Sequence, residues 1–440
     1  PKEYPVMRKM NRRELIEASG AVVAAEMTTR LSAADDTPIP VALIGCGGMG
    51  TGHLKLLVKN PKVKVAALAD VDANRLAESV KIVTDAGHPA PMATNDMRKI
   101  FDDPKIQAVW IATPDHWHAP ATILACDAGK HVYVEKPCSH NLREGRLMIE
   151  AARRSKKVVQ VGTQSRSTHH IQEAMKRIKS GAIGDVLVAK AWNSQKRGNI
   201  GHKQPSQPPP HLDFDKWLGP APERPYQSNL LHAIWRFWYE FGVGDIGNDG
   251  VHDIDIARWG LGVDTHPTKI TATGSKYFFD DDQQFPDTQY CVFEWPADGN
   301  VKHKRMLVYE QRDWSPYVQE GWENGDAYYG TKGMLILGKV GGWKMYGPKN
   351  KLMEEMSGTF DLPAHHENFL ATIAGKAEAT AEIEINHLST SLCHLANIAC
   401  RVGRTLTFDP SGEKFVNDSQ ANAMLRRAYR EGHWATPKNA

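Results

Sequence analysis

Short apolar runs alternate with longer amphipathic stretches in the first part of the chain. The runs at 39–44, 63–69, 106–112, 131–134 and 158–161 are apolar on both sides, which is typical of buried parallel strands. Helical spacing between them predicts helices over 50–59, 73–86, 119–128 and 142–155. This alternation predicts a doubly wound parallel sheet, whose ligands bind beyond the carboxyl ends of the strands.

Two helix starts carry their own signals. Ser139 or Asn141 is suited to cap the helix over 142–155. Pro120 is suited to the first turn of the helix over 119–128, where its missing N–H costs nothing.

After Arg166 the pattern changes. Alternating runs such as ITATGSKYF, TQYCVFEW and RMLVYEQ predict antiparallel strands. Residues 198–225 are rich in proline and glycine and predict a long loop, and helices are expected over 365–374, 388–402 and 419–429. We therefore expect an N-terminal segment (1–37), a dinucleotide-binding domain (38–163) and a substrate and oligomerisation domain (164–440).

Composition narrows the class of protein. The 440 residues carry 41% hydrophobic and 24% charged side chains with a net charge of +3, so nucleic acid and membrane surfaces are not expected partners. No apolar run is long enough to span a bilayer. The six cysteines form no CxxC pair and no metal-ligand spacing, which favours buried free thiols and no metal, although the sequence does not exclude a disulfide.

The first 37 residues differ in character from the rest. Arg12 and Arg13, followed by a small-residue stretch and an Ala/Ser-rich end, resemble a twin-arginine export signal. Glu17, Glu26 and Arg30 interrupt its apolar region. A periplasmic location through export and a cytoplasmic location with an N-terminal arm or tail both stay open.

The glycine-rich segment GCGGMG follows the first predicted strand. Gly45 would make the tight turn, Gly47 would let the backbone approach a pyrophosphate, and Gly50 would let the helix pack closely. The helix N-terminus would face the phosphates with its free N–H groups. Asp70 ends the second strand 20 positions after Gly50, where a carboxylate accepts hydrogen bonds from a ribose. This favours NAD over NADP, with Arg75 as the residue that leaves NADP open.

Two further predicted strands are followed by segments rich in polar and ionisable side chains: ATPDHWH from Ala112 and EKP from Glu135. With VGTQSR, LDFDKWLGPAPERPY, GNDGVHDIDIARW, YYGTKG and HHENFL, they make the chain resemble the Gfo/Idh/MocA oxidoreductase family from about residue 39 to the C-terminus. The resemblance implies a Rossmann domain and a C-terminal α/β domain with a large open, mostly antiparallel sheet. It also implies NAD in the cleft between them, carbohydrate-like substrates and a homo-oligomer, a dimer or tetramer.

The resemblance assigns site residues by motif. Lys136 of EKP would polarise the reacting oxygen, and His252 of GVH would handle its proton, for which an unperturbed pKa of about 6.5 is suited. The residues expected to bind the cofactor are Gly45, Gly47, Gly48, Met49, Gly50, Asp70, Thr113, Pro114, Asp115, His116, Trp117, His118, Glu135, Lys136 and Gln164.

One position departs from the family pattern. Many relatives have an aspartate four residues before the histidine, where this chain has Asn248, which we expect to orient substrate without sharing a proton. Asp249 is one step out of register, and Asp255 is placed to lie beside His252 on a helix and partly compensate. A metal site in this segment is disfavoured, because its carboxylates and histidine would radiate around the helix.

Ten of the twelve tryptophans follow Arg166. Trp192, Trp235, Trp238 and Tyr328 are candidates for an aromatic wall against a sugar ring, although large sheet domains also use such residues for packing. Arg166 and Asp249 are further substrate candidates, with an acid pair as the alternative for Arg166.

These observations predict an NAD-dependent oxidoreductase that moves hydride between nicotinamide and a hydroxyl or carbonyl of a sugar, cyclitol or glycoside. One alternative is a glycosidase with tightly bound, recycled NAD. The other is a non-catalytic NAD or sugar sensor.

Overall fold

The structure, a computed structural model, describes residues 37–440 except 298–302 and 316. The predicted export signal around Arg12 and Arg13 lies outside the described residues. Within them, no helix is long and apolar enough to cross a membrane. All six cysteines are free thiols, as predicted, and Cys400 alone is only partly buried.

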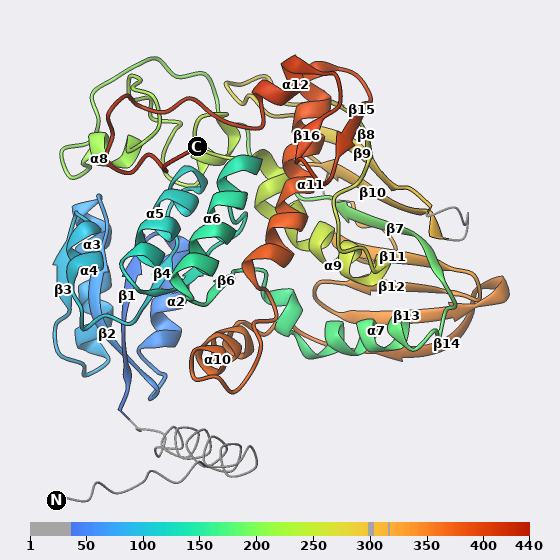
Figure 1. The fold of residues 1–440 in the computed structure, drawn as a ribbon, viewed down its shortest axis with the longest axis horizontal. Helices are drawn as coiled ribbons and strands as arrows, with labels where there is room; N and C mark the ends of the chain where they lie inside the picture. Colours follow the sequence, from blue (N-terminus) through green and yellow to red (C-terminus); the bar gives the residue numbers. More distant parts are fainter. Residues whose placement is uncertain (1–36, 298–302, 316) are drawn as a thin grey trace, which may run out of the picture. The chain divides into compact units, whose positions relative to one another are not determined.

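The first sheet has six parallel strands in the order β3-β2-β1-β4-β5-β6 (Figure 1). The strands are β1 (Ile39–Ile44), β2 (Val63–Ala69), β3 (Met92–Thr94), β4 (Ala108–Ile111), β5 (His131–Val134) and β6 (Val159–Val161). The helices are α2 (Gly48–Leu57), α3 (Ala73–Asp85), α4 (Arg98–Asp102), α5 (Asp115–Asp127) and α6 (Leu142–Ser155). The predicted Rossmann sheet is confirmed, and its strand order reverses between β1 and β4, where ligands bind in such folds.

Helix α5 begins at Asp115, four residues before the predicted start, so Pro120 lies inside it and not in its first turn. The proline cannot bond the carbonyl of His116 one turn earlier. That carbonyl instead accepts a hydrogen bond from Arg427 Nη2 at 2.7 Å, which explains why the helix tolerates the proline. Asn141, and not Ser139, caps α6 by accepting the N–H of Glu144 at 3.0 Å.

The second sheet has ten strands in the order β14-β13-β12-β11-β7-β10-β9-β8-β15-β16. Only β7 and β10 pair in parallel, so the predicted mostly antiparallel sheet is confirmed. Its strands are β7 (Val186–Asn193), β8 (Lys269–Ser275), β9 (Thr288–Trp295), β10 (Arg305–Arg312), β11 (Asn324–Gly330), β12 (Met334–Gly338), β13 (Gly342–Gly347), β14 (Lys351–Met356), β15 (Leu406–Asp409) and β16 (Lys414–Phe415).

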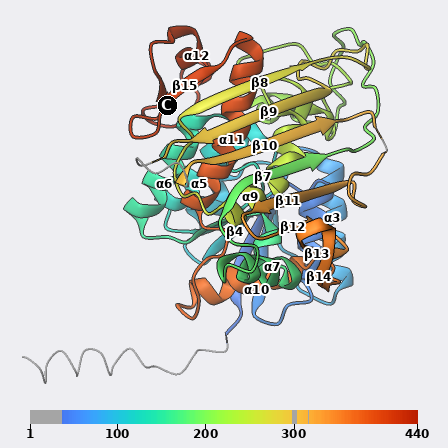
Figure 2. The ribbon, with the colours of Figure 1, turned by 90° about the vertical axis from the view of Figure 1, so that its right-hand side faces the viewer.

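One face of this sheet is covered by α7 (His169–Lys179), α9 (Val251–Leu261) and α11 (Ile383–Val402), and Figure 2 looks onto the opposite face. The remaining helices are short, apart from α10: η1 (Gln164–Ser167), α8 (Phe214–Leu218), η2 (Ile234–Phe237), the π-helix η3 (Ile246–Gly250), η5 (Pro348–Asn350), α10 (Leu362–Ile373) and α12 (Ser419–Ala423). The helix predicted over 419–429 is thus wrong beyond residue 423. There the chain leaves the helix, and Arg427 and Tyr429 both bond Glu144 of α6.

Helix α10 packs against the first sheet, although it follows the strands of the second. Phe369 meets the Trp110 ring edge-on at 5.1 Å, and Gln160 Nε2 donates to the His365 carbonyl at 2.9 Å. A boundary at residue 163 therefore separates the two sheets but cuts through the packing of the first.

Candidate cofactor and substrate site

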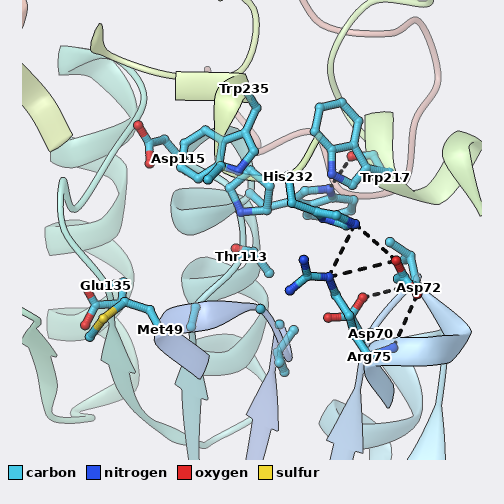
Figure 3. A pocket seen from close by; sticks show the side chains of 18 of the residues that line it. Met49, Asp70, Asp72, Arg75, Thr113, Asp115, Glu135, Trp217, His232 and Trp235 are labelled. Carbon is cyan, nitrogen blue, oxygen red and sulfur yellow. Dashed lines mark hydrogen bonds and ion pairs between the residues drawn. The ribbon is translucent and has the colours of Figure 1, made fainter. Parts of the chain in front are cut away.

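A cavity of about 500 Å³ opens at the carboxyl ends of β1, β2, β4 and β5. One wall comes from the turns after these strands, and the other from residues 212–236 of the following domain (Figure 3). The cavity lies at the strand-order reversal, where the sequence predicts the dinucleotide.

The glycine turn leaves an open cradle before α2. Gly45 has φ +94°, and a Cβ there would lie 2.5 Å from the Ala112 carbonyl oxygen. A Cβ on Gly50 would overlap the Gly45 carbonyl, so the helix can approach only because both residues are glycine. Gly48 has nothing within 4 Å of such an atom. The residues present fit a pyrophosphate at the N–H groups of this helix start.

Asp70 lines the cavity at the end of β2. Its two oxygens accept the backbone N–H groups of Cys46 at 2.6 Å and Asp72 at 2.8 Å, which fixes the plane of the carboxylate. Burial raises the pKa of Asp70, and these two hydrogen bonds oppose the rise. Arg75 is engaged by His232 at 3.3 Å and by Asp72 (Figure 3). This arrangement fits a ribose with free hydroxyls.

The ATPDHWH segment joins the two walls. His116 Nε2 and Trp117 Nε1 both contact the Trp217 carbonyl at 3.0 Å. His118 bridges the carbonyls of Thr113 and Pro137, at 2.9 and 2.7 Å, and so ties the loop after β4 to the EKP loop. These side chains hold the cleft together.

Lys136 is held by Asn248. Its Nζ donates to the Asn248 backbone oxygen at 2.6 Å and to its Oδ1 at 3.3 Å. Asn248 belongs to the π-helix η3, a wide turn that recurs at functional sites. Asn248 Nδ2 donates to Asp245 at 2.9 Å, which turns Oδ1 toward the lysine. Burial lowers the pKa of Lys136, so its ammonium is a strong donor to an oxygen in the cavity.

His252 lies one helical turn after Asn248, at the start of α9. It is buried, and Nδ1 has no partner among the described residues. Burial, followed by the charges of Lys339 and Lys136, lowers the pKa of His252 well below its usual value. The imidazole is therefore neutral and suited to accept a proton.

Asp249 forms no hydrogen bond or ion pair with His252, on which it acts only through space, and it faces three other polar groups. It accepts from Gln195, from Arg197 at 2.9 Å and from Lys339 at 3.1 Å. Burial opposes its ionisation, but the charges of Lys339 and Lys136 lower its pKa well below the usual range. Asp255 is paired with Arg166, at 2.7 and 2.8 Å, so the expectation that it compensates for Asn248 is wrong.

The comparisons with known proteins agree with this geometry. The description "Oxidoreductase family, NAD-binding Rossmann fold" (GFO_IDH_MocA) matches residues 39–163, and "Oxidoreductase family, C-terminal alpha/beta domain" matches residues 169–436. The chain belongs to the Gfo/Idh/MocA oxidoreductase family. The cofactor of this NAD-binding family is NAD, as predicted.

Relatives in the family are similar in sequence to part of the chain. A levoglucosan dehydrogenase of Pseudarthrobacter phenanthrenivorans is 31% identical over 226 residues, 50% of this chain and 51% of the relative. A scyllo-inositol 2-dehydrogenase (NAD(+)) of Bacillus subtilis is 26% identical over 304 residues, 68% and 73%. A "Glycosyl hydrolase family 109 protein" of Shewanella pealeana is 27% identical over 208 residues, 42% and 46%. The match therefore spans about half the length of two of these relatives.

Solved structures share the fold. A levoglucosan dehydrogenase in complex with NADH and levoglucosan superposes with a TM-score of 0.65 at 20% identity, covering 84% of this chain and 99% of that one.

Most of the predicted site residues line the cavity. Those that do are Gly45, Gly47, Gly48, Met49, Asp70, Thr113, Pro114, Asp115, Trp117, His118, Glu135, Lys136, Trp235 and Asn248. The residues that do not line the cavity include Gly50, His116, Gln164, His252 and Asp249. Gln164 donates to Glu135 at 3.2 Å, and Glu135 also contacts His53 at 2.9 Å.

Most residues of the expected aromatic wall do not line the cavity. Trp192 packs on the sheet face away from α9, since its neighbour Ala191 points into the α9 core and successive strand residues alternate. Tyr328 is fully buried and donates to the Ile256 carbonyl at 2.8 Å, and Trp238 donates to the Asn229 carbonyl. Arg166 is likewise committed to Asp255. These four are packing residues, and only Trp235 of the expected wall lines the cavity.

Sequence reasoning missed several lining residues, among them Trp217, His232 and Arg236. Trp217 stands in the quoted segment LDFDKWLGPAPERPY, which was an available signal. His232 precedes the short helix η2 and Arg236 lies within it, and only the aromatic and basic composition of this segment marks it.

Proposed function

We propose that this protein is an NAD-dependent dehydrogenase of a secondary hydroxyl on a sugar or cyclitol. The observation that carries the proposal is Lys136, which lines the NAD cavity with its Nζ aimed by two oxygens of Asn248. The names of the levoglucosan and inositol dehydrogenases among its relatives support the substrate class.

The proposed chemistry divides between two side chains. The ammonium of Lys136 donates to the substrate oxygen and stabilises the negative charge that grows there. The neutral imidazole of His252 takes the hydroxyl proton. Bound NAD+ supplies the acceptor for the hydride that leaves the same carbon. In reduction, the same residues return the proton and polarise the carbonyl.

The test is a screen of the purified protein with added NAD+ against sugars, cyclitols and glycosides, read as NADH formation, together with an assay for retained cofactor. Steady NADH formation with a free sugar or cyclitol is expected. Glycoside cleavage with retained NAD and no NADH accumulation would instead establish the NAD-recycling glycosidase. Tight NAD binding without turnover of any compound would establish a sensor.

We also propose that the chain forms a homo-oligomer through the sheet face opposite α9. Along β9 every second side chain points to this face, including Tyr290, and Tyr329 of β11 is also exposed. Light scattering of the purified protein is expected to give a dimer or tetramer, and Tyr290→Arg with Tyr329→Arg is expected to reduce it to monomers. A wild-type monomer at micromolar concentration would overturn this proposal.

A further inference from the structure

Arg236 is a cation in the cavity that forms no ion pair with any residue the structure describes. It lines the same cavity as Lys136, and its guanidinium stacks on Trp235 with 5.3 Å between its Cζ and the ring centre. Its Nε is buried without a hydrogen-bond partner, and no described residue places a carboxylate within ion-pair distance of it. Burial lowers the pKa of Arg236, and the through-space charges of Asp245, Asp115 and Asp249 offset this only in part.

Neighbouring cations, in contrast to Arg236, form ion pairs with carboxylates. Arg197 pairs with Asp245 at 3.0 Å and with Asp249 at 2.9 Å, and Lys339 pairs with Asp249 at 3.1 Å. The two acids of this region are thus already shared among other donors. Lys136 and Arg236, which face the cavity, form no ion pair with a described residue, and carboxylates act on them only through space.

The nearest acid of the cavity wall does not replace the missing partner. Asp115 also lines the cavity (Figure 3), and it forms no ion pair with Arg236. Burial raises the pKa of Asp115, and the charges of Lys136 and Arg236 oppose the rise through space.

The backbone of Arg236 is fixed. A Cβ on Gly242 would overlap the Arg236 Cα, so the two segments touch. The next residue, Phe237, accepts the Gln284 N–H at 3.0 Å, and the Trp238 indole donates to the Asn229 carbonyl at 3.1 Å. The guanidinium is therefore presented to the cavity by packed chain, and a ligand would not have to order it first.

We propose that Arg236 binds a carboxylate of the substrate, and that this enzyme acts on sugar acids such as hexuronates or aldonates. The inference rests on the proposed dehydrogenase function and names its substrate class. The carboxylate keeps all its bonds in the reaction. The hydroxyl carbon loses a hydride to NAD+ and the hydroxyl loses its proton to His252.

A carboxylate fits better than a phosphate. The planar fork of one guanidinium matches the two oxygens of a carboxylate. A phosphate dianion would need further donors, and Lys136 is aimed by Asn248 at the reacting oxygen. The pyrophosphate of the cofactor has its own donors at the start of α2, so it does not account for Arg236.

The test compares substrates that differ only in this group: D-glucuronate with D-glucose, and D-galacturonate with D-galactose. With NAD+ and the full chain, kcat/KM is expected to be at least about tenfold higher for each acid, as one charge-assisted hydrogen-bond pair provides. Arg236→Gln should lower kcat/KM for the acids about 100-fold, mainly through KM, and change the neutral sugars little. Arg236→Lys should recover part of the loss.

Two controls separate this role from damage to the loop or to cofactor binding. Arg224→Gln removes an arginine that stacks on Trp238 and pairs with Glu240 outside the cavity, so it should leave both substrate classes unchanged. Calorimetry should show that Arg236→Gln keeps the Kd for NADH and that D-glucuronate binding to the NADH-loaded protein depends on Arg236.

Three outcomes decide the inference. Equal losses for acids and neutral sugars in Arg236→Gln would overturn it, as would a weakened NADH Kd with an unchanged preference between acid and neutral sugar. Arg236-dependent glucuronate binding without oxidation of any sugar would support the carboxylate site and contradict the proposed dehydrogenase reaction instead.

Discussion

Asn248 determines the electrostatics of the proposed catalytic pair at the scale of single residues. Its side-chain oxygen is 3.3 Å from Lys136 Nζ but carries no charge, so neither Lys136 nor His252 has a carboxylate at this position. The burial that lowers the pKa of both groups is therefore offset less than an aspartate would offset it.

Asn248→Asp is expected to raise the pKa of both groups, because a nearby negative charge favours their protonated forms. The acid limb of kcat against pH for sugar oxidation, where His252 must be neutral, should move up by about one to three pH units. Asn248→Ala is the control, because it keeps the backbone oxygen that Lys136 contacts at 2.6 Å and adds no charge. The acid limb of its pH profile should remain at the wild-type pH. Identical pH profiles for the two variants would contradict this assignment.

The residues of the cofactor half were predictable from sequence because short-range rules determine them. Gly45 and Gly50 are required by backbone overlap, and Asp70 by its place at the end of β2. Trp192 shows the opposite case. Its strand was evident, but which face of the sheet packs against α9 depends on tertiary packing, and strand alternation does not contain that information.

At the scale of elements, the cleft depends on contact between the start of α5 and the segment after α8. Gly219 has φ +53°, and a Cβ there would overlap the Trp117 ring. The same ring donates to the Trp217 carbonyl, so a bulkier residue 219 would separate two elements that line the cavity.

Gly219→Ala is expected to lower the free energy of unfolding by about 2–4 kcal/mol, from left-handed strain and overpacking. Gly198→Ala is the matched control in the same long loop, since it meets nothing within 4 Å and has no positive φ. It should change stability by less than about 0.5 kcal/mol. Urea unfolding of both variants gives the comparison, and equal stabilities would refute the contact.

A second element contact joins β16 and the turn before it to α6 and α11. Glu413 Oε1 accepts from His266 at 2.9 Å, from His387 at 2.8 Å and from Arg146 at 2.6 Å. Burial alone would raise the pKa of Glu413, but these hydrogen bonds lower it well below its usual range. The contribution to stability is therefore present at neutral pH and is lost as pH falls through the native pKa.

Glu413→Gln is expected to cost about 1–3 kcal/mol of unfolding free energy at neutral pH. The difference from wild type should shrink on acidification below about pH 4, where the unfolded carboxylate takes up its proton. Glu378→Gln, at an exposed position, serves as the control. A difference that is independent of pH would show that the charge of Glu413 does not matter.

Elements were predicted well where the run was clearly apolar, and poorly where it was exposed or where tertiary contacts decide the conformation. The strands at 39–44, 63–69 and 131–134 have the predicted bounds, but β3 (Met92–Thr94) was missed because its residues are mostly exposed and form no apolar run. The helix expected over 419–429 failed because tertiary contacts of Arg427 and Tyr429 replace helical hydrogen bonds there.

At the scale of the whole molecule, residues far apart in sequence complete the site. Residues 212–236 supply the second wall of the NAD cavity, and α10 packs on the first sheet from beyond residue 360. The role proposed for Arg236 could not be predicted from the sequence because no motif marks the residue. Its place in the cavity and its lack of an ion pair are properties of the folded cleft.

The central claim is that this cleft transfers hydride between NAD and a sugar hydroxyl with Lys136 as the polarising group. The most direct measurement is kcat of Lys136→Met against wild type on an oxidised sugar, with the Kd for NADH measured on both proteins. We expect kcat to fall by about 100-fold or more while the Kd for NADH changes little. Near-normal turnover by Lys136→Met would contradict the account.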